Sequence, residues 1–266
     1  MRFLRRGAAS LGCLLAATTI SVPAAAVFPD NPTTEFKAVG MIGNYVGGNF
    51  KMNGCGVAIA PNWVIGVAHV GGNTFEQDGK FYPIAKKIIY KSSDGKEPAD
   101  LAVYRLAIPC TYRADLQTKL DEQGKASRTV TIVGFGETGA KRQDGSGWRI
   151  TQGSEGTRRL TTETIDYYGW DRYNIGSNDD PKWKNSLSIA YHLRPGSQGG
   201  IAGKDSGCGW FFNDAGHQVL IAVAASVGHP ESTKDNYRYG AVGFGIALQP
   251  YLAWIRQQTK IPAISH

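Results

Sequence analysis

Short apolar runs alternate with turns rich in glycine, proline and asparagine along most of this chain. Runs of about four to eight residues with many Val, Ile and aromatic side chains, bounded by such turns, are typical of β-strands. The run at residues 219–225 is apolar throughout, which indicates a strand buried on both faces. The pattern predicts strands at residues 37–45, 55–59, 63–67, 86–91, 101–106, 129–133, 219–225 and 244–248.

The pattern changes near the C-terminus, where it predicts one helix from residue 250 to about 260. Pro250 suits the first helical position, and Tyr251, Leu252 and Ile255 fall on one side of the helix. Residues 108–127 are polar and weakly patterned, so we interpret them as a crossover between two halves of the chain. Residues 27–35 are polar and contain two prolines, which predicts an extended arm.

The N-terminal residues have the pattern of a secretory signal peptide. Three arginines precede an apolar stretch at residues 8–22, and small residues at 24–26 supply a cleavage site. We therefore predict a signal peptide at residues 1–26, cleaved after Ala26, and a secreted or periplasmic protein that begins at Val27. An N-terminal anchor helix is the alternative. No other apolar run reaches membrane-spanning length, so no membrane association is expected after signal removal.

Composition narrows the classes of function. Removal of the three N-terminal arginines lowers the formal charge of the chain from +7 to +4, which gives no support for nucleic-acid binding. No Cys-x-x-Cys or His-Glu-x-x-His spacing occurs, so neither a metal nor a cofactor is expected. Residues 134–139 match Gly-x-Gly-x-x-Gly, but no helical pattern follows them, and we interpret them as a β-turn. Three cysteines follow the signal segment, and an odd number in an exported protein predicts one bridge and one free thiol.

Three stretches carry the parts of a charge-relay hydrolase, in the order histidine, aspartate, serine. They supply His69 after Gly-Val-Ala, Asp100 before Leu-Ala-Val, and Ser206 between Asp and Gly. A serine hydroxyl is a poor nucleophile unless a base takes its proton and a carboxylate orients that base. We expect these residues to be catalytic, and we interpret the remaining histidines as surface or loop residues: His192, His217, His229 and His266.

The sequence around these residues resembles the trypsin/chymotrypsin-like serine proteases, particularly secreted bacterial members. The resemblance rests on residues 54–69 around the histidine, 100–109 around the aspartate, 133–136, 203–209 around the serine, and 225–228. It implies an all-β fold of two packed antiparallel six-stranded β-barrels with a C-terminal α-helix. The first barrel would span residues 27–115 and carry His69 and Asp100. The second would span residues 116–266 and carry Ser206 and the helix.

The resemblance also implies roles for other residues. The protein would be a monomeric serine endopeptidase that cleaves protein or peptide substrates through an acyl-enzyme intermediate. The backbone N–H groups of Lys204 and Ser206 would form the oxyanion hole, and Ser226 would support Asp100. The pocket floor would carry no acidic side chain, which predicts a preference for uncharged substrate side chains. The residues expected to border the substrate are Gly200, Ile201, Ser226, Val227 and Gly228.

Several positions depart from the family pattern. Lys204 stands where the family has glycine, and Gly54 and Val70 stand where it has a disulfide around the histidine. These departures leave open an alternative function, a catalytically dormant or inactive protease-fold binding protein. The fold implied by the resemblance would also bring Cys55 beside Cys208 and so predicts a disulfide between them; the alternative is three reduced, buried cysteines.

One further expectation concerns maturation. In the family a freed N-terminal amine pairs with the aspartate before the serine, and signal cleavage here would place Val27 in that role opposite Asp205. The alternative is that residues 27–35 form a loose arm and that Asp205 finds another partner, such as a lysine or arginine side chain.

Overall fold

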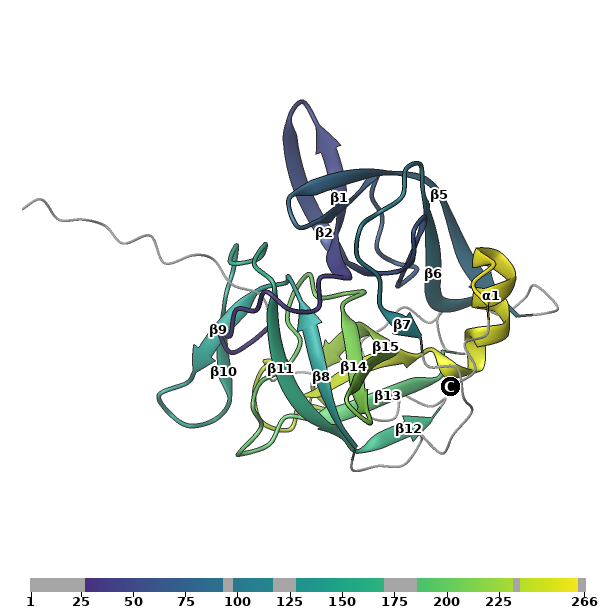
Figure 1. Cartoon of the computed structure of the whole chain (residues 1–266). Coiled ribbons are helices and arrows are strands. Elements are labelled where there is room, and N and C mark those ends of the chain that lie inside the picture. Colours follow the sequence, from purple (N-terminus) through teal and green to yellow (C-terminus); the bar gives the residue numbers. More distant parts are fainter. Residues whose placement is uncertain (1–26, 93–97, 117–127, 170–185, 232–234, 263–266) are drawn as a thin grey trace, which may run out of the picture.

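A computed structural model describes residues 27–92, 98–116, 128–169, 186–231 and 235–262. The predicted signal peptide, most of the crossover and His266 lie outside the described residues. Figure 1 shows the arrangement of the chain, in which strands form nearly all of the regular structure and one short helix lies near the C-terminus. The predicted strands all form, and the sequence pattern therefore identified the fold class correctly.

The first half of the chain closes into an antiparallel six-stranded barrel. Its strands follow the order β1-β2-β3-β6-β5-β4. The last seven residues of β2 are buried on both faces, because this end of the strand lies between the barrel interior and the second half of the molecule. The strands are β1 (Val39–Val46), β2 (Asn49–Ala60), β3 (Trp63–Gly66), β4 (Thr74–Gln77), β5 (Lys80–Lys91) and β6 (Pro98–Leu106).

The second half forms an open sheet in the described residues, not the closed six-stranded barrel that the resemblance implied. Eight strands take part, with the order β11-β8-β14-β15-β16-β13-β12 and with β7 paired in parallel to β15. A separate two-stranded sheet, β9–β10, projects beside them. The strands are β7 (Asp115–Leu116), β8 (Arg128–Gly134), β9 (Thr138–Lys141), β10 (Trp148–Thr151), β11 (Arg159–Ile165), β12 (Tyr167–Gly169), β13 (Ser188–His192), β14 (Gly209–Asp214), β15 (His217–Gly228) and β16 (Val242–Ala247).

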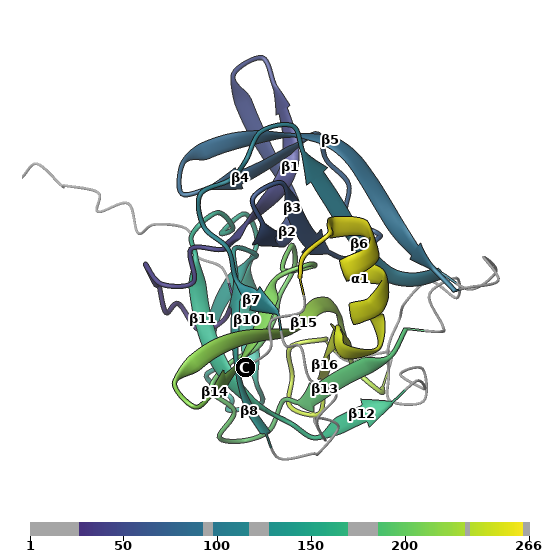
Figure 2. The ribbon, with the colours of Figure 1, turned by 45° about the vertical axis from the view of Figure 1, so that its right-hand side comes forward.

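The predicted C-terminal helix is present and lies against the closed barrel (Figure 2). A 3-10 turn at Gln249–Tyr251 leads into α1 (Leu252–Thr259). The ring of Tyr90 on β5 packs edge-on against Tyr251 and Trp254, with ring centroids 4.7 and 5.3 Å away. The helix therefore ties the end of the chain to the first half. Among the described residues, no helix has both the length and the apolar character needed to cross a bilayer.

The N-terminal arm is fixed to the second sheet, so the interpretation of a loose arm is wrong. Phe28 is fully buried and exchanges two backbone hydrogen bonds with Gly200, of 3.1 and 2.9 Å. Further along the arm, the Leu160 N–H donates to the Asn31 carbonyl, and the buried Arg159 guanidinium donates to Asp30 at 2.7 Å. The arm thus lies against the start of β11.

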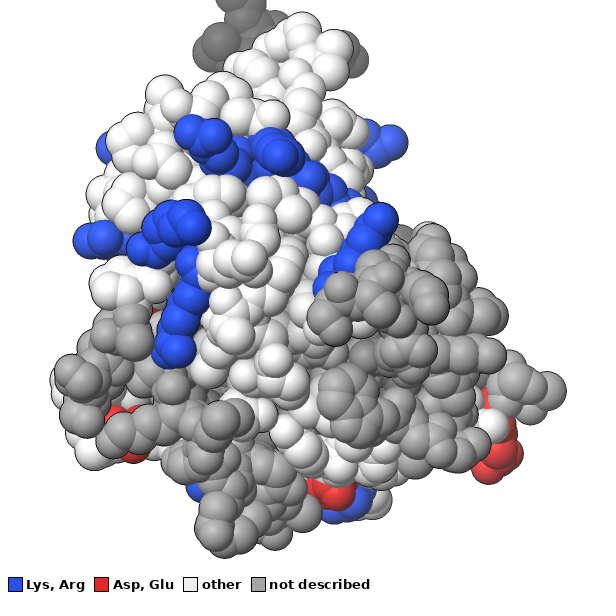
Figure 3. All heavy atoms as spheres, turned by 90° about the vertical axis from the view of Figure 1, so that its right-hand side faces the viewer, with Lys and Arg blue, Asp and Glu red and all other residues white. Residues whose placement is uncertain are grey.

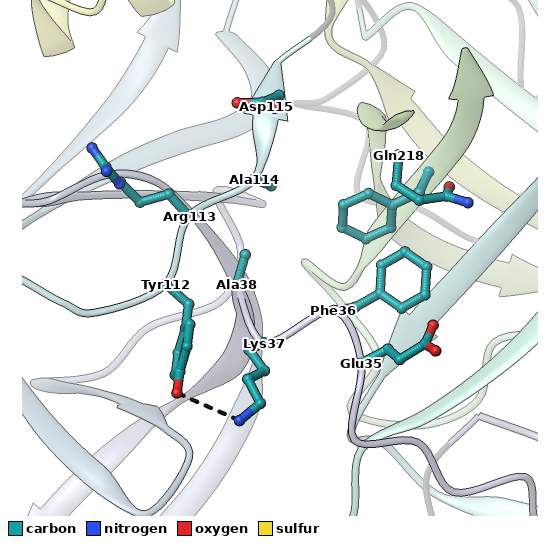
Figure 4. A pocket seen from close by; sticks show the side chains of 10 residues that line it. Glu35, Phe36, Lys37, Ala38, Tyr112, Arg113, Ala114, Asp115 and Gln218 are labelled. Atoms are coloured by element: carbon teal, nitrogen blue, oxygen red, sulfur yellow. Dashed lines mark hydrogen bonds between the residues drawn. The ribbon is translucent and has the colours of Figure 1, made fainter. Parts of the chain in front are cut away.

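A hollow of about 340 Å³ opens where the arm meets β7, β14 and β15 (Figure 4). The rings of Phe36 and Phe211 pack against each other there at 4.8 Å, and Lys37 reaches the hydroxyl of Tyr112. None of the residues expected to be catalytic lines it. It is therefore distinct from the site described next.

Candidate active site

His69 and Asp100 form a hydrogen-bonded pair at one end of the closed barrel. The Nδ1 atom of His69 lies 2.8 Å from Oδ2 of Asp100, and the backbone N–H of His69 donates to Oδ1 at 3.0 Å. The carboxylate is 1% exposed, whereas the imidazole is 38% exposed. Two hydrogen bonds from one residue fix the carboxylate relative to the histidine. The imidazole keeps its Nε2 edge for another partner.

Two side chains of neighbouring strands hold the histidine loop, residues 67–70. The ammonium group of Lys87 on β5 donates to the carbonyls of Ala68 and Val70, at 2.5 and 2.7 Å. The hydroxyl of Tyr104 on β6 lies 2.8 Å from the carbonyls of Val67 and Val70. Burial lowers the pKa of Lys87, and the nearby Asp100 carboxylate opposes that shift. The loop carbonyls therefore have partners although no disulfide closes the loop.

Ser206 lies on a tight loop between β13 and β14 that is fastened to both halves of the molecule. Its carbonyl accepts the N–H of Cys55 on β2 at 2.7 Å, and the next residue, Gly207, donates to Ala224 on β15 at 2.7 Å. Gly207 has a φ of +89°, and a Cβ there would lie 2.1 Å from the Cys55 carbonyl oxygen, so only glycine fits. The serine hydroxyl donates to the Ala225 carbonyl, 3.4 Å away.

Gly54 brings the histidine loop and the serine loop together on β2. A Cβ at Gly54 would lie 2.6 Å from a methyl group of Val70 and 2.8 Å from the carbonyl oxygen of Ser206. Both loops therefore contact the same point of the strand. The absence of a side chain at Gly54 is what allows the residue after His69 and the expected nucleophile to approach each other so closely.

Lys204 adopts the backbone conformation that usually requires glycine. Its φ is +66°, in the left-handed region, and its ammonium group forms an ion pair with Glu155. Among the described residues, the backbone N–H groups of Lys204 and Ser206 have no hydrogen-bond acceptor. The lysine therefore keeps a left-handed backbone beside the serine.

Asp205 is fully buried beneath the serine loop. Its Oδ1 accepts the N–H of Gly136 at 2.8 Å, and its Oδ2 accepts the N–H of Ala202 at 2.9 Å. Burial raises the pKa of Asp205 to about 7, while N–H donors, including that of Val27, and the nearby Arg159 guanidinium act in the opposite direction. The expected neighbour, Val27, is therefore beside this carboxylate, and Arg159 supplies a nearby positive charge.

The residues expected to bind substrate lie on two segments next to the serine loop. Gly200 and Ile201 are buried in front of Tyr191, whose hydroxyl accepts the Ile201 N–H at 2.7 Å. Ser226 and Val227 are half-buried on β15, directly after Ala225, which contacts the Ser206 hydroxyl. Gly228, at the end of β15, is buried and pairs with β16.

Three contributors to the site were missed by sequence reasoning. Ser186, which no motif singled out, accepts the backbone N–H of Asp100 at 2.8 Å. Lys87 and Tyr104 carry no motif, because a lysine and a tyrosine in strands look like ordinary surface and core residues. Only the pairing of Lys87 with Tyr104 across β5 and β6 places both beneath the histidine loop.

The cysteines differ from expectation, whereas His229 lies in the loop after β15, as expected of a surface or loop residue. Cys55, Cys110 and Cys208 are all free and buried, so the predicted Cys55–Cys208 disulfide is absent. The Cys55 thiol instead donates to the Lys204 carbonyl at 3.6 Å, and burial raises the pKa of all three thiols. Among the histidines, His192 is a strand residue paired with Asp166 at 2.8 Å, and His229 is buried.

Neither the protein-family models nor the curated proteins that were compared with this chain match it. Any assignment of function therefore depends on the geometry of the residues themselves.

Proposed function

We propose that this protein is a secreted serine endopeptidase of the trypsin/chymotrypsin-like type, with His69, Asp100 and Ser206 as its catalytic residues. The observation that carries the proposal is the hydrogen bond between the buried Asp100 carboxylate and the exposed His69 imidazole, held beside a serine loop that shares the Gly54 contact with the histidine loop. The closed barrel packed against a second sheet supports the same family. The contact between Gly54 and Val70 also supports it, because the family has a disulfide between these two positions.

In the proposed reaction Asp100 holds the proton of His69 on Nδ1, which leaves Nε2 as the base. The Ser206 hydroxyl turns from the Ala225 carbonyl, gives its proton to Nε2, and its oxygen attacks the peptide carbonyl carbon. The protonated His69 then transfers that proton to the leaving amine, and an acyl-enzyme remains on Ser206. Water, deprotonated by His69, attacks the ester and regenerates the serine.

The N–H groups of Lys204 and Ser206 would stabilise the oxyanion that forms in each step. Removal of a single donor of this kind lowers the rate by on the order of a hundred- to a thousandfold. The left-handed backbone at Lys204 supports this role, since a non-glycine residue in that conformation costs about 1–3 kcal/mol and persists only where its surroundings hold it. The ion pair with Glu155 and the Lys204 carbonyl contact with Cys55 are the contacts that hold it.

The substrate preference follows from the segment before the serine. Neither Gly200 nor Ile201 carries a charge, and Tyr191 fills the space behind them. We therefore propose cleavage after uncharged side chains. A peptide-library profile dominated by arginine or lysine before the cleaved bond would contradict this.

A dormant binding protein is the second candidate, and the resting hydrogen bond of the Ser206 hydroxyl to Ala225 favours it. A fluorophosphonate probe distinguishes the two, because it labels only a serine activated by a working charge relay. We expect covalent labelling of the chain that begins at Val27, and no labelling of the Ser206→Ala or His69→Ala variants. A folded chain that resists labelling, or a Ser206→Ala variant that still turns over peptides, would reject the enzyme proposal.

A further inference from the structure

A β-hairpin projects beyond the closed barrel at the end farthest from the second sheet (Figure 1). β1 pairs with β4 only as far as Gly43, whereas its pairing with β2 continues to Val46 opposite Asn49. The turn is formed by Gly47 and Gly48, with φ values of +59° and +84°, and a Cβ at either position would meet no atom within 4 Å. The hairpin therefore ends in open solvent.

Three large apolar side chains at this end are exposed. Val46 is 69% exposed, Tyr45 is 40% exposed and Phe81 is 42% exposed. The Phe81 ring packs against Tyr45 at 4.7 Å and against Phe50 at 5.5 Å, so the aromatic side chains support one another. We call Tyr45, Val46, Phe50 and Phe81 the hairpin tip. Three of the five large apolar side chains that are exposed in the described residues belong to it.

Positive charge lies behind the hairpin tip. β1, β2 and β5 contain no acidic residue and five lysines; apart from Lys87, which bonds to the histidine loop, these are exposed: Lys51, Lys80, Lys86 and Lys91. Lys86 on β5 lies directly opposite Arg105 on β6, a like-charged pair that an external anion would stabilise. On the face formed by β5, β6 and α1, Figure 3 shows lysine and arginine side chains across the described surface and acidic ones only toward its edges.

We propose that the hairpin tip inserts into the interface of a lipid bilayer with anionic headgroups. A soluble polyanion would use the lysines but would leave the tip exposed to water. A bilayer interface provides apolar surroundings for Val46 and the aromatic rings and negative charge at the level of the lysines. The tip is convex, which suits insertion into a deformable surface. Tyrosine is a side chain that favours this boundary.

The spacing of residues along the hairpin agrees with insertion of its tip into the bilayer interface. Lys51 pairs with Asn44, two residues behind the turn pair Val46–Asn49. At about 3.3 Å per strand residue, Lys51 lies about 7 Å behind the end of the tip. Interfacial segments bury their apolar side about 5–10 Å deep, so the lysine would meet the headgroups when Val46 reaches the acyl region.

Vesicle flotation of the chain that begins at Val27 tests the proposal. We expect it to float with phosphatidylcholine vesicles that contain phosphatidylglycerol, less with phosphatidylcholine alone, and less at high salt. Val46→Asp should lower the partition by about tenfold or more, because it replaces an inserted apolar side chain with a charge. The matched control is Ile108→Asp, which places the same charge on another exposed apolar residue, 49% exposed, outside the tip; it should bind as the parent does.

Several results would overturn the proposal. One is no binding to either vesicle, and another is equal binding by Val46→Asp and its parent. Binding that ignores phosphatidylglycerol would remove the role of the lysines. Binding to dextran sulfate that matches vesicle binding and survives Val46→Asp would identify a soluble polyanion as the partner. A dimer in sedimentation analysis that Val46→Asp abolishes would identify a second copy of the chain. None of these measurements depends on catalysis.

Discussion

Replacement of Lys87 by methionine tests how the histidine loop is held without a disulfide. The substitution keeps the aliphatic stem and removes the ammonium group, which contacts the loop and lies 5.6 Å from the centre of the Tyr104 ring. The carbonyl of Ala68 then loses its described partner, whereas that of Val70 still lies 2.8 Å from the Tyr104 hydroxyl. His69 sits between these two carbonyls in the sequence, so the loss should affect both stability and catalysis.

The magnitude follows from the two hydrogen bonds. A hydrogen bond that involves a charged group contributes about 1.5–3 kcal/mol. Because Tyr104 continues to serve one of the two carbonyls, we expect the free energy of unfolding to fall by about 2–4 kcal/mol. For a chain of this size that corresponds to a Tm lower by about 5–15 °C. A displacement of His69 by even a fraction of an ångström would also slow acylation by tenfold or more.

The assay combines urea denaturation with the rate of fluorophosphonate labelling. Lys87→Arg is the matched control, because it retains a cation and hydrogen-bond donors; it should recover part of both quantities. Tyr104→Phe should show non-additive effects with Lys87→Met, since both side chains serve the Val70 carbonyl. A Lys87→Met variant with the stability and labelling rate of its parent would refute the reasoning.

Three further predictions concern the neighbouring positions. A chain with one extra residue before Val27 should lose stability as pH rises from about 4 to about 7, measured by urea denaturation at several pH values. The reason is that folded Asp205, with a pKa raised to about 7, keeps a proton that the unfolded chain releases. In the chain that begins at Val27 the free ammonium should remove that decline in stability. The same decline in both chains would exclude an ion pair between the Val27 ammonium and Asp205. Lys204→Gly should label as fast as its parent or faster, since glycine adopts the left-handed conformation without strain, and a tenfold slower rate would contradict this. Gly54→Cys combined with Val70→Cys should form a disulfide detectable by non-reducing peptide mapping, because the nearest atom that a Cβ at position 54 would meet belongs to Val70. A double variant that stays reduced under oxidising conditions would show that the two positions are not in bonding distance.

The sequence predicted the strands because they depend on short local patterns, and the Asp100–His69 pairing because the residues around both resemble the serine proteases. Closure of the second sheet depends on which strand edges meet, and the alternation of apolar and polar residues carries no information on that. The Cys55–Cys208 disulfide was predicted from neighbouring elements, but the orientation of a thiol depends on its own surroundings, and Cys55 turns toward the Lys204 carbonyl. Lys87 could not be distinguished from other strand lysines, because its role arises only from the register between β5 and β6.

The buried start of the N-terminal arm sets an order of events during biogenesis. Val27 and Phe28 are 0% exposed, and the arm that follows them is hydrogen-bonded to the start of β11. A processing protease needs an extended, accessible segment across its active site, and a folded chain does not offer one at this position. The predicted cut before Val27 would therefore have to be made while the chain is still unfolded. Once the arm had docked, the same burial would protect the new terminus from trimming by aminopeptidases.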